Sequence, residues 1–318
     1  MKFSESTLKE YAAPLSATED AKCKRAIEMI RDALKDLGYT DDNKPLTLLA
    51  EDTASYSIQM RSSQSTERVS IFVQGSYANN TCVRTESDVD IAVVREDLYE
   101  TSFDSGADSS TTTQKGKAHA FKGAVEIELR KAFPYQVHRG NKSIKVDGNT
   151  YRKKADVVPC CAMTCYNKWI YGDKSSSQAG IVIYADDGQI VRNFPKQHIA
   201  NGRKKNVDTG YRYKKAVRIF KKIRYLMEDY GYSSAKNISS FGLESLLWNV
   251  PDTVYTKYYT LGFIVDEVLT FLHNNSQSIS SYKEANGIKK LCPKSSDANK
   301  YIEFIGNMKT FFNYVYGE

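Results

Sequence analysis

Asp88 and Asp90 stand two positions apart at the start of an apolar run, ending near Val94, that is typical of a β-strand. Alternate side chains of a strand point to the same face, so these two carboxylates are expected side by side. Neighbouring carboxylates repel each other unless a cation lies between them. Asp156 stands in a second strand-like run, residues 155–159, where an unpaired charge would be costly to bury. The three aspartates therefore predict a shared catalytic site for divalent metal ions.

Oxygen ligands at this density favour Mg²⁺ or Mn²⁺, which proteins hold with a few carboxylates and with substrate phosphates. Two ions about 3.5 to 4 Å apart would activate an attacking hydroxyl and neutralise a leaving pyrophosphate in an in-line displacement. We therefore expect two Mg²⁺ or Mn²⁺ ions and chemistry at the α-phosphate of a nucleotide.

The tripeptide Gln74-Gly75-Ser76 follows the β-branched run 69–73 and precedes the aspartates. Glycine lets the backbone approach an anion closely, and the serine hydroxyl and nearby amides can bind phosphate oxygens. Taken singly, a Gly-Ser pair is usually an ordinary turn, and two aspartates at this spacing are frequent on exposed strands. Their order along the chain is more specific, and it predicts that Gln74, Gly75 and Ser76 bind nucleotide phosphates beside the metal site.

The hydrophobic pattern predicts strands and helices in the first part of the chain. Ser16 and Glu19 form a possible capping box before a helix that ends at Gly38. Another helix is expected at 118–133, and strands are expected at 69–73, 89–94, 144–146, 155–159, 181–184 and 189–192, the last two forming a hairpin. Residues 101–116, rich in Ser, Thr, Asp and Gly, are expected to form a mobile surface loop.

After Pro195 the strand signals stop. Helices are expected at 208–230, 239–249, 254–273 and 297–316. We therefore expect a boundary within 193–208 and two domains. Residues 1–200 would form the catalytic core with its N-terminal helix, and residues 201–318 a helical domain that completes a nucleotide-binding cleft.

The composition fits a soluble protein that handles anions. Among 318 residues, Lys and Arg number 45 and Asp and Glu 38, and the net charge of +7 suits nucleotides or nucleic acid without choosing between them. No apolar run has the length of a signal peptide or membrane span, so a cytoplasmic protein without a membrane partner is expected. The six irregularly spread cysteines favour free thiols, and zinc bound by Cys160, Cys161 and Cys165 is the less favoured alternative.

The order of these motifs resembles the signature of the polymerase-β-like nucleotidyltransferase superfamily, with VQGSY at 73–77 and SDVDIAV at 87–93. Within it, ADVVP at 155–159 and SFGLE at 240–244 resemble the branch that contains oligoadenylate synthetase, cyclic GMP-AMP synthase and the bacterial cGAS/DncV-like nucleotidyltransferases (CD-NTases). Chain length, the lack of appended domains and NFPKQH at 193–198 look most like the CD-NTases of anti-phage CBASS operons.

The resemblance implies the α+β fold class, with a polymerase-β-like core built on a mixed sheet and a helical C-terminal domain. It implies that Asp88, Asp90 and Asp156 are the catalytic, metal-binding triad. Arg218 and Lys221, one helical turn apart, resemble the basic residues that grip the donor triphosphate. A solvated helix face is the alternative for these two cations.

Ser240 and Phe241 resemble a polar-aromatic pair, in which the serine touches the triphosphate and the ring stacks on the donor base. The bases used, the linkage and the ring size do not follow from the sequence. Asn167, shortly after the third aspartate, is a candidate contact to the acceptor base, with an ordinary loop residue as the alternative.

The resemblance implies an enzyme that joins ribonucleoside triphosphates, including ATP, into a cyclic di- or trinucleotide with release of pyrophosphate. A downstream effector would sense this product, and a separately encoded protein could regulate the enzyme. No zinc-ribbon spacing or extended basic surface is present, so nucleic acid is not expected to be required. The alternatives are a nucleotidyltransferase acting on RNA, tRNA or a protein, and a binding module with a dead site.

Overall fold

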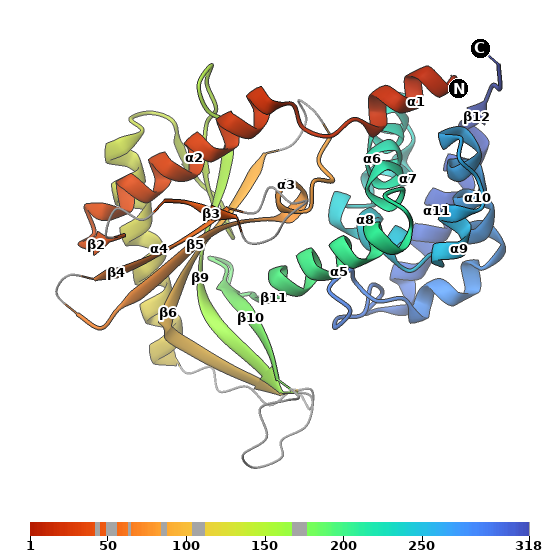
Figure 1. Cartoon of the computed structure of the whole chain (residues 1–318). Coiled ribbons are helices and arrows are strands. Elements are labelled where there is room, and N and C mark those ends of the chain that lie inside the picture. The colour runs from red at the N-terminus through yellow and green to blue at the C-terminus, as the bar shows by residue number, and fades with distance from the viewer. Residues whose placement is uncertain are drawn as a thin grey trace. The chain divides into compact units, whose positions relative to one another are not determined.

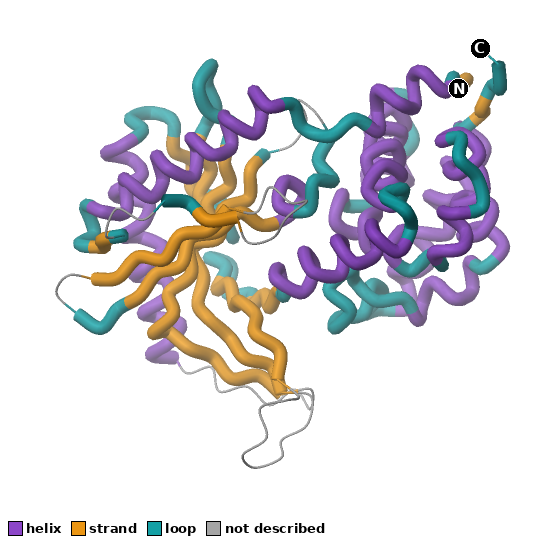
Figure 2. The backbone as a smooth tube through the Cα atoms, viewed as in Figure 1, coloured by secondary structure: helices purple, strands orange, loops and turns teal. Residues whose placement is uncertain are grey.

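The computed structural model describes residues 1–41, 45–48, 56–62, 65–83, 88–103, 112–166 and 177–317. The chain divides into two compact units. The sheet unit comprises Ser16–Ala78 and Asp88–Lys196, and the helical unit comprises Met1–Leu15, Asn79–Ser87 and Gln197–Glu318. Strands dominate the first and helices the second (Figures 1 and 2).

The sheet unit is built on a mixed sheet whose main path runs β11-β10-β9-β6-β5-β4-β2. Its strands are β2 (Tyr39–Thr40), β3 (Thr47–Leu48), β4 (Tyr56–Ser62), β5 (Arg68–Gln74), β6 (Val89–Phe103), β7 (Val137–Arg139), β8 (Ile144–Val146), β9 (Ala155–Tyr166), β10 (Ser177–Tyr184) and β11 (Ile190–Asn193). Strand β6 pairs with β9 in parallel, and the other described pairs of this sheet are antiparallel. Consecutive residues Ile91, Ala92 and Val93 of β6 are all fully buried, as expected of a central strand covered on both faces.

Two long helices pack on this sheet, α2 (Ala17–Lys35) and α4 (Thr112–Ala132), and the short α3 (Gly75–Ala78) follows β5. Helices α2 and α4 contact each other, and they contact β5 and β9 respectively (Figure 1). The predicted capping box is confirmed, because Ser16 Oγ accepts from the Glu19 amide at 3.2 Å and Glu19 Oε2 accepts from the Ser16 amide at 3.2 Å.

The helical unit packs around α6, whose side chains are buried on most sides and which contacts α1, α7, α8, α10 and α11. Its elements are β1 (Lys2–Phe3), α1 (Glu5–Ala12), α5 (Pro195–Asp208), α6 (Tyr213–Asp229), α7 (Ser233–Lys236), α8 (Ser240–Trp248), α9 (Asp252–Thr256), α10 (Leu261–Asn274), the 3₁₀ helix η1 (Ser276–Ser281), α11 (Ser295–Phe311) and β12 (Asn313–Tyr314). Strands β1 and β12 pair in parallel and bring the two ends of the unit together.

The strands predicted from the sequence are present, but several other expectations need correction. Part of the expected loop 101–116 is regular, because β6 continues to Phe103 and α4 begins at Thr112. The helix expected at 208–230 is α6 alone, preceded by an unpredicted α5 and a turn in which Gly210 and Tyr211 have positive φ. The helix expected at 254–273 is divided into α9 and α10, and α1 was not predicted. Asn167 lies outside the described residues.

The two compact units contain different segments of the chain from the two domains expected from the sequence. The chain passes from the sheet unit to the helical unit between Lys196 and Gln197, close to the expected boundary. However, Met1–Leu15 and Asn79–Ser87 group with the helical unit, although the sequence placed both in the core. The local hydrophobic pattern cannot reveal which unit such a segment joins, because that is decided by packing between segments far apart in the sequence.

The six cysteines are all buried free thiols. Burial raises the pKa of the Cys161 thiol to about 12, and it also raises that of Cys160 well above its usual range. These two cysteines are therefore unreactive packing residues. Among the described helices, none is long and apolar enough to cross a membrane.

The capping box gives a direct test of the fold of the sheet unit. Ser16→Ala removes the side-chain acceptor for the Glu19 amide, and we expect a loss of about 1 kcal/mol of unfolding free energy. Ser16→Asp restores an acceptor and should recover most of that loss. Chemical denaturation monitored by circular dichroism measures the difference, and equal stability of Ser16→Ala and wild type would contradict the assignment.

Candidate active site

Strand pairing aligns polar side chains from distant parts of the chain in a single row. Asp90 of β6 is the register partner of Gln74 on β5 and of Asp156 on β9, which in turn pairs with Lys145 on β8. Side chains at directly paired positions project from the same face of a sheet. The structure therefore brings Asp90 and Asp156 together as neighbours, with Gln74 on one flank and a lysine on the other.

Gly75 lies against the carboxylate of Asp90. Its φ of 68° is in the left-handed region that favours glycine. A Cβ atom at this position would collide with Asp90 Oδ2. Any other residue would therefore displace either the carboxylate or the turn that carries Ser76 into α3, which makes Gly75 a steric requirement of the aspartate row.

Asp88 immediately precedes β6, and its side chain is 37% exposed. Its Oδ2 lies 3.1 Å from the Nζ of Lys154, the residue that precedes β9 by one position. The hydrogen bond and charge of Asp88 raise the pKa of Lys154. A lysine ammonium thus neutralises this carboxylate, at the end of the sheet where the sequence predicted a metal cation.

Asp156 is half-buried, and its Oδ1 has no hydrogen-bond partner among the described residues. Burial raises the pKa of this carboxyl, and the nearby charge of Asp88 raises it further, against the opposing effect of Lys145. A buried oxygen without a donor is expensive unless a ligand satisfies it. Asp156 Oδ1 is therefore a candidate ligand for a cation.

No three acidic, histidine or cysteine side chains in the described part of the chain are close enough together to enclose a metal ion. The backbone register nevertheless suits one, because Asp90 and Asp156 are adjacent and Asp88 lies on the same strand end. Rotation of the exposed Asp88 side chain away from Lys154 is the rearrangement that a three-carboxylate site would need.

In the helical unit, Arg218 and Lys221 are not on a solvated helix face. Arg218 is 5% exposed and donates to the carbonyl oxygens of Ala12 and Asn80. Lys221 is 2% exposed, and its Nζ lies 2.7 Å from Glu244 Oε2. Both cations are buried and contact groups inside the unit, so the alternative of a solvated face is wrong, whereas their predicted grip on a triphosphate stays a prediction. The reason is that α6 is a core helix, buried on most sides.

One turn further along α6, Arg224 was missed by the sequence analysis. Its Nη2 donates to Ser240 Oγ at 3.2 Å, and its buried Nε has no hydrogen-bond partner within the described residues. Ser240 begins α8, and the next residue, Phe241, is 39% exposed and contacts the His198 ring edge-on at 5.1 Å. Arg224 is itself only 6% exposed, and its Nη1 also donates to Glu228 Oε1 and to the Ile238 carbonyl oxygen. The Ser240 hydroxyl, which accepts from Arg224, and the exposed ring of Phe241 form a pair that suits a nucleotide. The sequence did contain a signal for Arg224, because it follows Lys221 by three positions, the same spacing that separates Lys221 from Arg218.

Comparisons with known proteins identify the family of this chain. Residues 200–313 match the family described as the cGAS/DncV-like nucleotidyltransferase C-terminal helical domain. The chain is 42% identical to the cyclic GMP-AMP synthase CdnE03 of Staphylococcus schleiferi over 99% of its length and 98% of the relative. The chain belongs to the CD-NTase family. It is therefore an enzyme, a nucleotidyltransferase, as the sequence predicted.

Two further relatives support the assignment of this CD-NTase. It is 32% identical to the cyclic dipyrimidine nucleotide synthase CdnE of Cecembia lonarensis over 98% of this chain and 99% of the relative. The solved structure of Elizabethkingia meningoseptica CdnE cyclic dinucleotide synthase with GTP and Apcpp superposes with a TM-score of 0.74 at 29% identity, covering 97% of this chain and 98% of that one. The predicted polymerase-β-like α+β fold with a helical C-terminal domain is thus confirmed.

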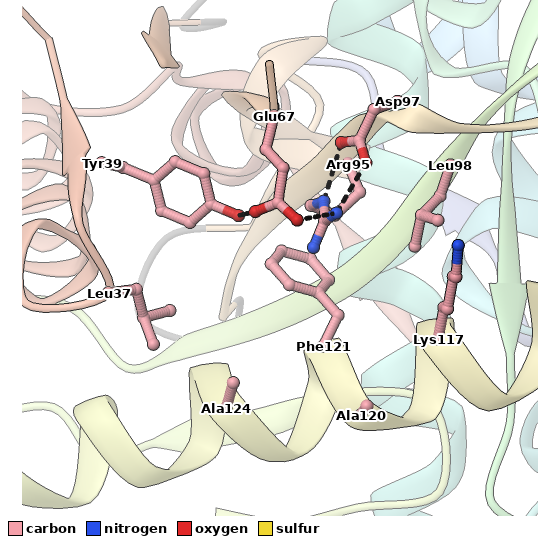
Figure 3. Close-up of a pocket in the computed structure, with 10 residues that line it drawn as sticks. All are labelled: Leu37, Tyr39, Glu67, Arg95, Asp97, Leu98, Lys117, Ala120, Phe121 and Ala124. Carbon is pink, nitrogen blue, oxygen red and sulfur yellow. Dashed lines mark hydrogen bonds and ion pairs between the residues drawn. The ribbon is translucent and has the colours of Figure 1, made fainter. Parts of the chain in front are cut away.

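A pocket of about 420 Å³ lies elsewhere in the sheet unit of this CD-NTase (Figure 3). The guanidinium of Arg95 is held there by Glu67 Oε1 at 2.8 Å and by Asp97 Oδ2 at 2.6 Å. Arg95 is five positions from Asp90 along β6, which places it on the opposite face of the strand. None of the predicted site residues lines this pocket, so the aspartate row remains the candidate active site.

The collision between Asp90 and a side chain at position 75 leads to a prediction. Gly75→Ala should lower the affinity for Mn²⁺ in the presence of a non-hydrolysable nucleotide by at least about tenfold, because the carboxylate must move. Gly38→Ala is the matched control, since Gly38 also has a positive φ of 86° but open space around its Cβ position. Calorimetric titration measures both, and equal Mn²⁺ affinities in the two variants would contradict the steric argument.

Proposed function

We propose that this CD-NTase joins ribonucleoside triphosphates into a cyclic di- or trinucleotide and releases pyrophosphate at each step. The observation that carries the proposal is the register that aligns Asp90 with Asp156 beside Gly75. Support also comes from relatives that are named as cyclic nucleotide synthases and match nearly the whole chain. The product would act as a second messenger in bacterial anti-phage defence, sensed by a downstream effector.

The residues fit a divalent metal site of the kind that nucleotidyl transfer uses. Asp88, Asp90 and Asp156 would hold two Mg²⁺ or Mn²⁺ ions, and the unpartnered oxygen of Asp156 is one expected ligand. Such ions supply Lewis-acid activation of a ribose hydroxyl and neutralise the charge on the leaving pyrophosphate. Burial raises the pKa of Asp156, and a cation bound beside this carboxylate would lower that pKa.

The protein would bind the donor nucleotide through two sets of groups. Gln74, Gly75 and Ser76 would bind its phosphates through backbone amides and the serine hydroxyl. In the helical unit, Ser240 would contribute its hydroxyl, and Arg224, which donates to that hydroxyl, would contribute positive charge near the phosphates. Phe241 would stack on the base, as its exposed ring allows. Arg224, buried like Arg218 and Lys221, joins them as a proposed triphosphate-binding cation.

Ring closure would use the same aspartates a second time, after the linear intermediate rebinds with its ends exchanged. The relatives differ in their bases, since one is named for GMP and AMP and another for two pyrimidines. Identifying the product is therefore an experimental question. A separately encoded regulatory protein and a cytoplasmic location belong to the same proposal, and the alternative acceptors are RNA, tRNA and protein.

Incubation of the purified protein with the four ribonucleoside triphosphates and Mg²⁺ or Mn²⁺ tests the proposal. We expect a cyclic di- or trinucleotide and pyrophosphate, identified by mass spectrometry and by digestion with linkage-specific nucleases. Labelled nucleotide appearing in added RNA, tRNA or protein, with no cyclic product, would instead support the alternative acceptor.

Substitution of a single aspartate tests whether the proposed metal site is needed for catalysis. Asp90→Asn should lower the rate of product formation by at least about a thousandfold, because one metal ligand loses its charge. Asp187→Asn, in the exposed turn between β10 and β11, is the control and should leave the rate unchanged. Product formation by Asp90→Asn within tenfold of wild type would rule out the proposed metal site.

The proposed role of Arg224 leads to a further prediction. Arg224→Ala should raise KM for ATP by about tenfold, which corresponds to the loss of one charged hydrogen bond to phosphate. Arg212→Ala, an arginine at the start of the same helix that lies over the ring of Tyr259, is the control and should change KM less than twofold. A larger effect of Arg212→Ala than of Arg224→Ala would refute the proposed role of Arg224.

A further inference from the structure

The segment that directly follows the phosphate-binding pair has an unusual environment. Residues 79–83 continue from α3, which begins at Gly75, but they group with the helical unit. Asn79 and Thr81 in this segment are fully buried. Buried polar side chains need partners. Here the partners are polar and charged side chains of α5, α6 and α8, all within the helical unit.

Side chains of helices α6 and α8 form hydrogen bonds with both the main chain and the hydroxyl of Thr81. The Nζ of Lys221 donates to the Thr81 carbonyl oxygen at 3.1 Å and to Glu244 Oε2 at 2.7 Å. The Thr81 hydroxyl donates to the same Glu244 oxygen at 2.6 Å. Arg218 donates to the preceding carbonyl, that of Asn80. Hydrogen bonds to charged groups are the stronger class, so this part of the backbone is firmly placed.

The second oxygen of Glu244 extends the cluster to α5. His198 Nε2 lies 2.8 Å from Glu244 Oε1, and the His198 Nδ1 lies 3.1 Å from Asn79 Nδ2. Burial alone would raise the pKa of Glu244, but Lys221 and His198 together lower it below its usual range. The carboxylate is therefore charged in a buried site, where loss of a partner is costly. Helix α5 also approaches closely at Gly202, where a Cβ would lie 2.8 Å from Asn79 Oδ1.

The same cluster reaches the ring proposed to stack on the donor base. The rings of His198 and Phe241 meet edge to face, with centroids 5.1 Å apart and an interplanar angle of 81°. Such pairs have a defined geometry and favourable energy. Glu244 thus contacts Thr81 directly and Phe241 through His198. One carboxylate is joined to the segment after Ser76 and to the base-stacking ring.

We propose that Glu244, Lys221 and His198 form a positioning cluster for nucleotide binding. By holding Asn79 and Thr81, the cluster constrains the backbone that directly follows α3 and, through the covalent chain, the Gly75-Ser76 pair at the start of α3. None of the three cluster residues needs to touch the nucleotide. The inference rests on the proposed role of Gly75-Ser76 and deepens it, because it assigns part of the affinity for triphosphate to a buried anchor that follows this pair in the chain.

Thr81→Val tests the anchor with little change in shape. It removes the hydroxyl that donates to Glu244 and accepts from Lys221 at 3.3 Å, and it leaves the ion pair between Glu244 and Lys221 in place. We expect Thr81→Val to weaken the binding of a non-hydrolysable ATP analogue with Mg²⁺ by about fivefold or more, because both hydrogen bonds of the hydroxyl to charged groups are lost. Thr81→Ser keeps the hydroxyl and should bind within twofold of wild type.

Thr209→Val is the matched control for the loss of a buried hydroxyl. Thr209 is also fully buried in the helical unit, and its Oγ1 donates to the Lys205 carbonyl at 2.8 Å, outside the cluster. Both valine variants should lower the melting temperature by similar amounts. Only Thr81→Val should weaken binding of the analogue. If the Thr81 hydroxyl only stabilised the fold, the two variants would change the affinity for the analogue equally.

Calorimetry with the ATP analogue decides the outcome independently of turnover. Thr81→Val binding within twofold of wild type, or a loss shared equally by Thr209→Val, would overturn the inference. If wild type binds the analogue and Thr81→Val weakens it while no cyclic product forms, the anchor stands and the proposed reaction fails. If wild type does not bind the analogue, the role of Gly75-Ser76 and this inference fall together.

Discussion

The parallel pairing of β6 with β9 is the interaction on which the candidate active site depends. It joins segments far apart in the chain and sets Asp90 directly beside Asp156. A slip of one residue would turn one carboxylate to the other face of the sheet. The buried neighbours prevent this, since Val93 and Val157 pack on one face, whereas Ala92 and Val158 belong to a core cluster on the other. The hydrophobic core thus specifies the geometry of a polar site.

Placing aspartate carboxylates close together costs electrostatic free energy, because like charges repel. Two lysines of the chain reduce this repulsion but do not abolish it. Lys154 pairs with Asp88, and Lys145 lies in register with Asp156. Both members of the Lys154–Asp88 pair are more than a third exposed, and exposed ion pairs contribute little to stability. A divalent cation can therefore replace this lysine at small cost. Asp156 keeps a buried oxygen without a donor, so the site is arranged to fold alone and to gain stability from a cation.

The sequence was most informative where chemistry and local pattern coincide. Aspartates inside apolar strands predicted Asp90 and Asp156 as neighbours, and the Ser16 capping box was visible from two residues. It was least informative about burial, since Arg218 and Lys221 look like a basic surface but lie in a core helix. Their partners, at Asn80, Thr81 and Glu244, come from distant segments that no local period can reveal. Arg224 was missed because its relevance depends on Ser240, which tertiary packing brings to it.

Membership of the CD-NTase family rests on similarity over nearly the whole chain, whereas the metal site rests on this chain's own aspartates. The central claim is that the paired carboxylates bind the catalytic cations. Electron paramagnetic resonance of Mn²⁺, titrated in the presence of a non-hydrolysable nucleotide, measures this directly by counting bound ions in wild type and Asp156→Asn. The account predicts two Mn²⁺ ions per wild-type chain and the loss of at least one of them in the variant. Two ions retained with unchanged affinity in Asp156→Asn would contradict it.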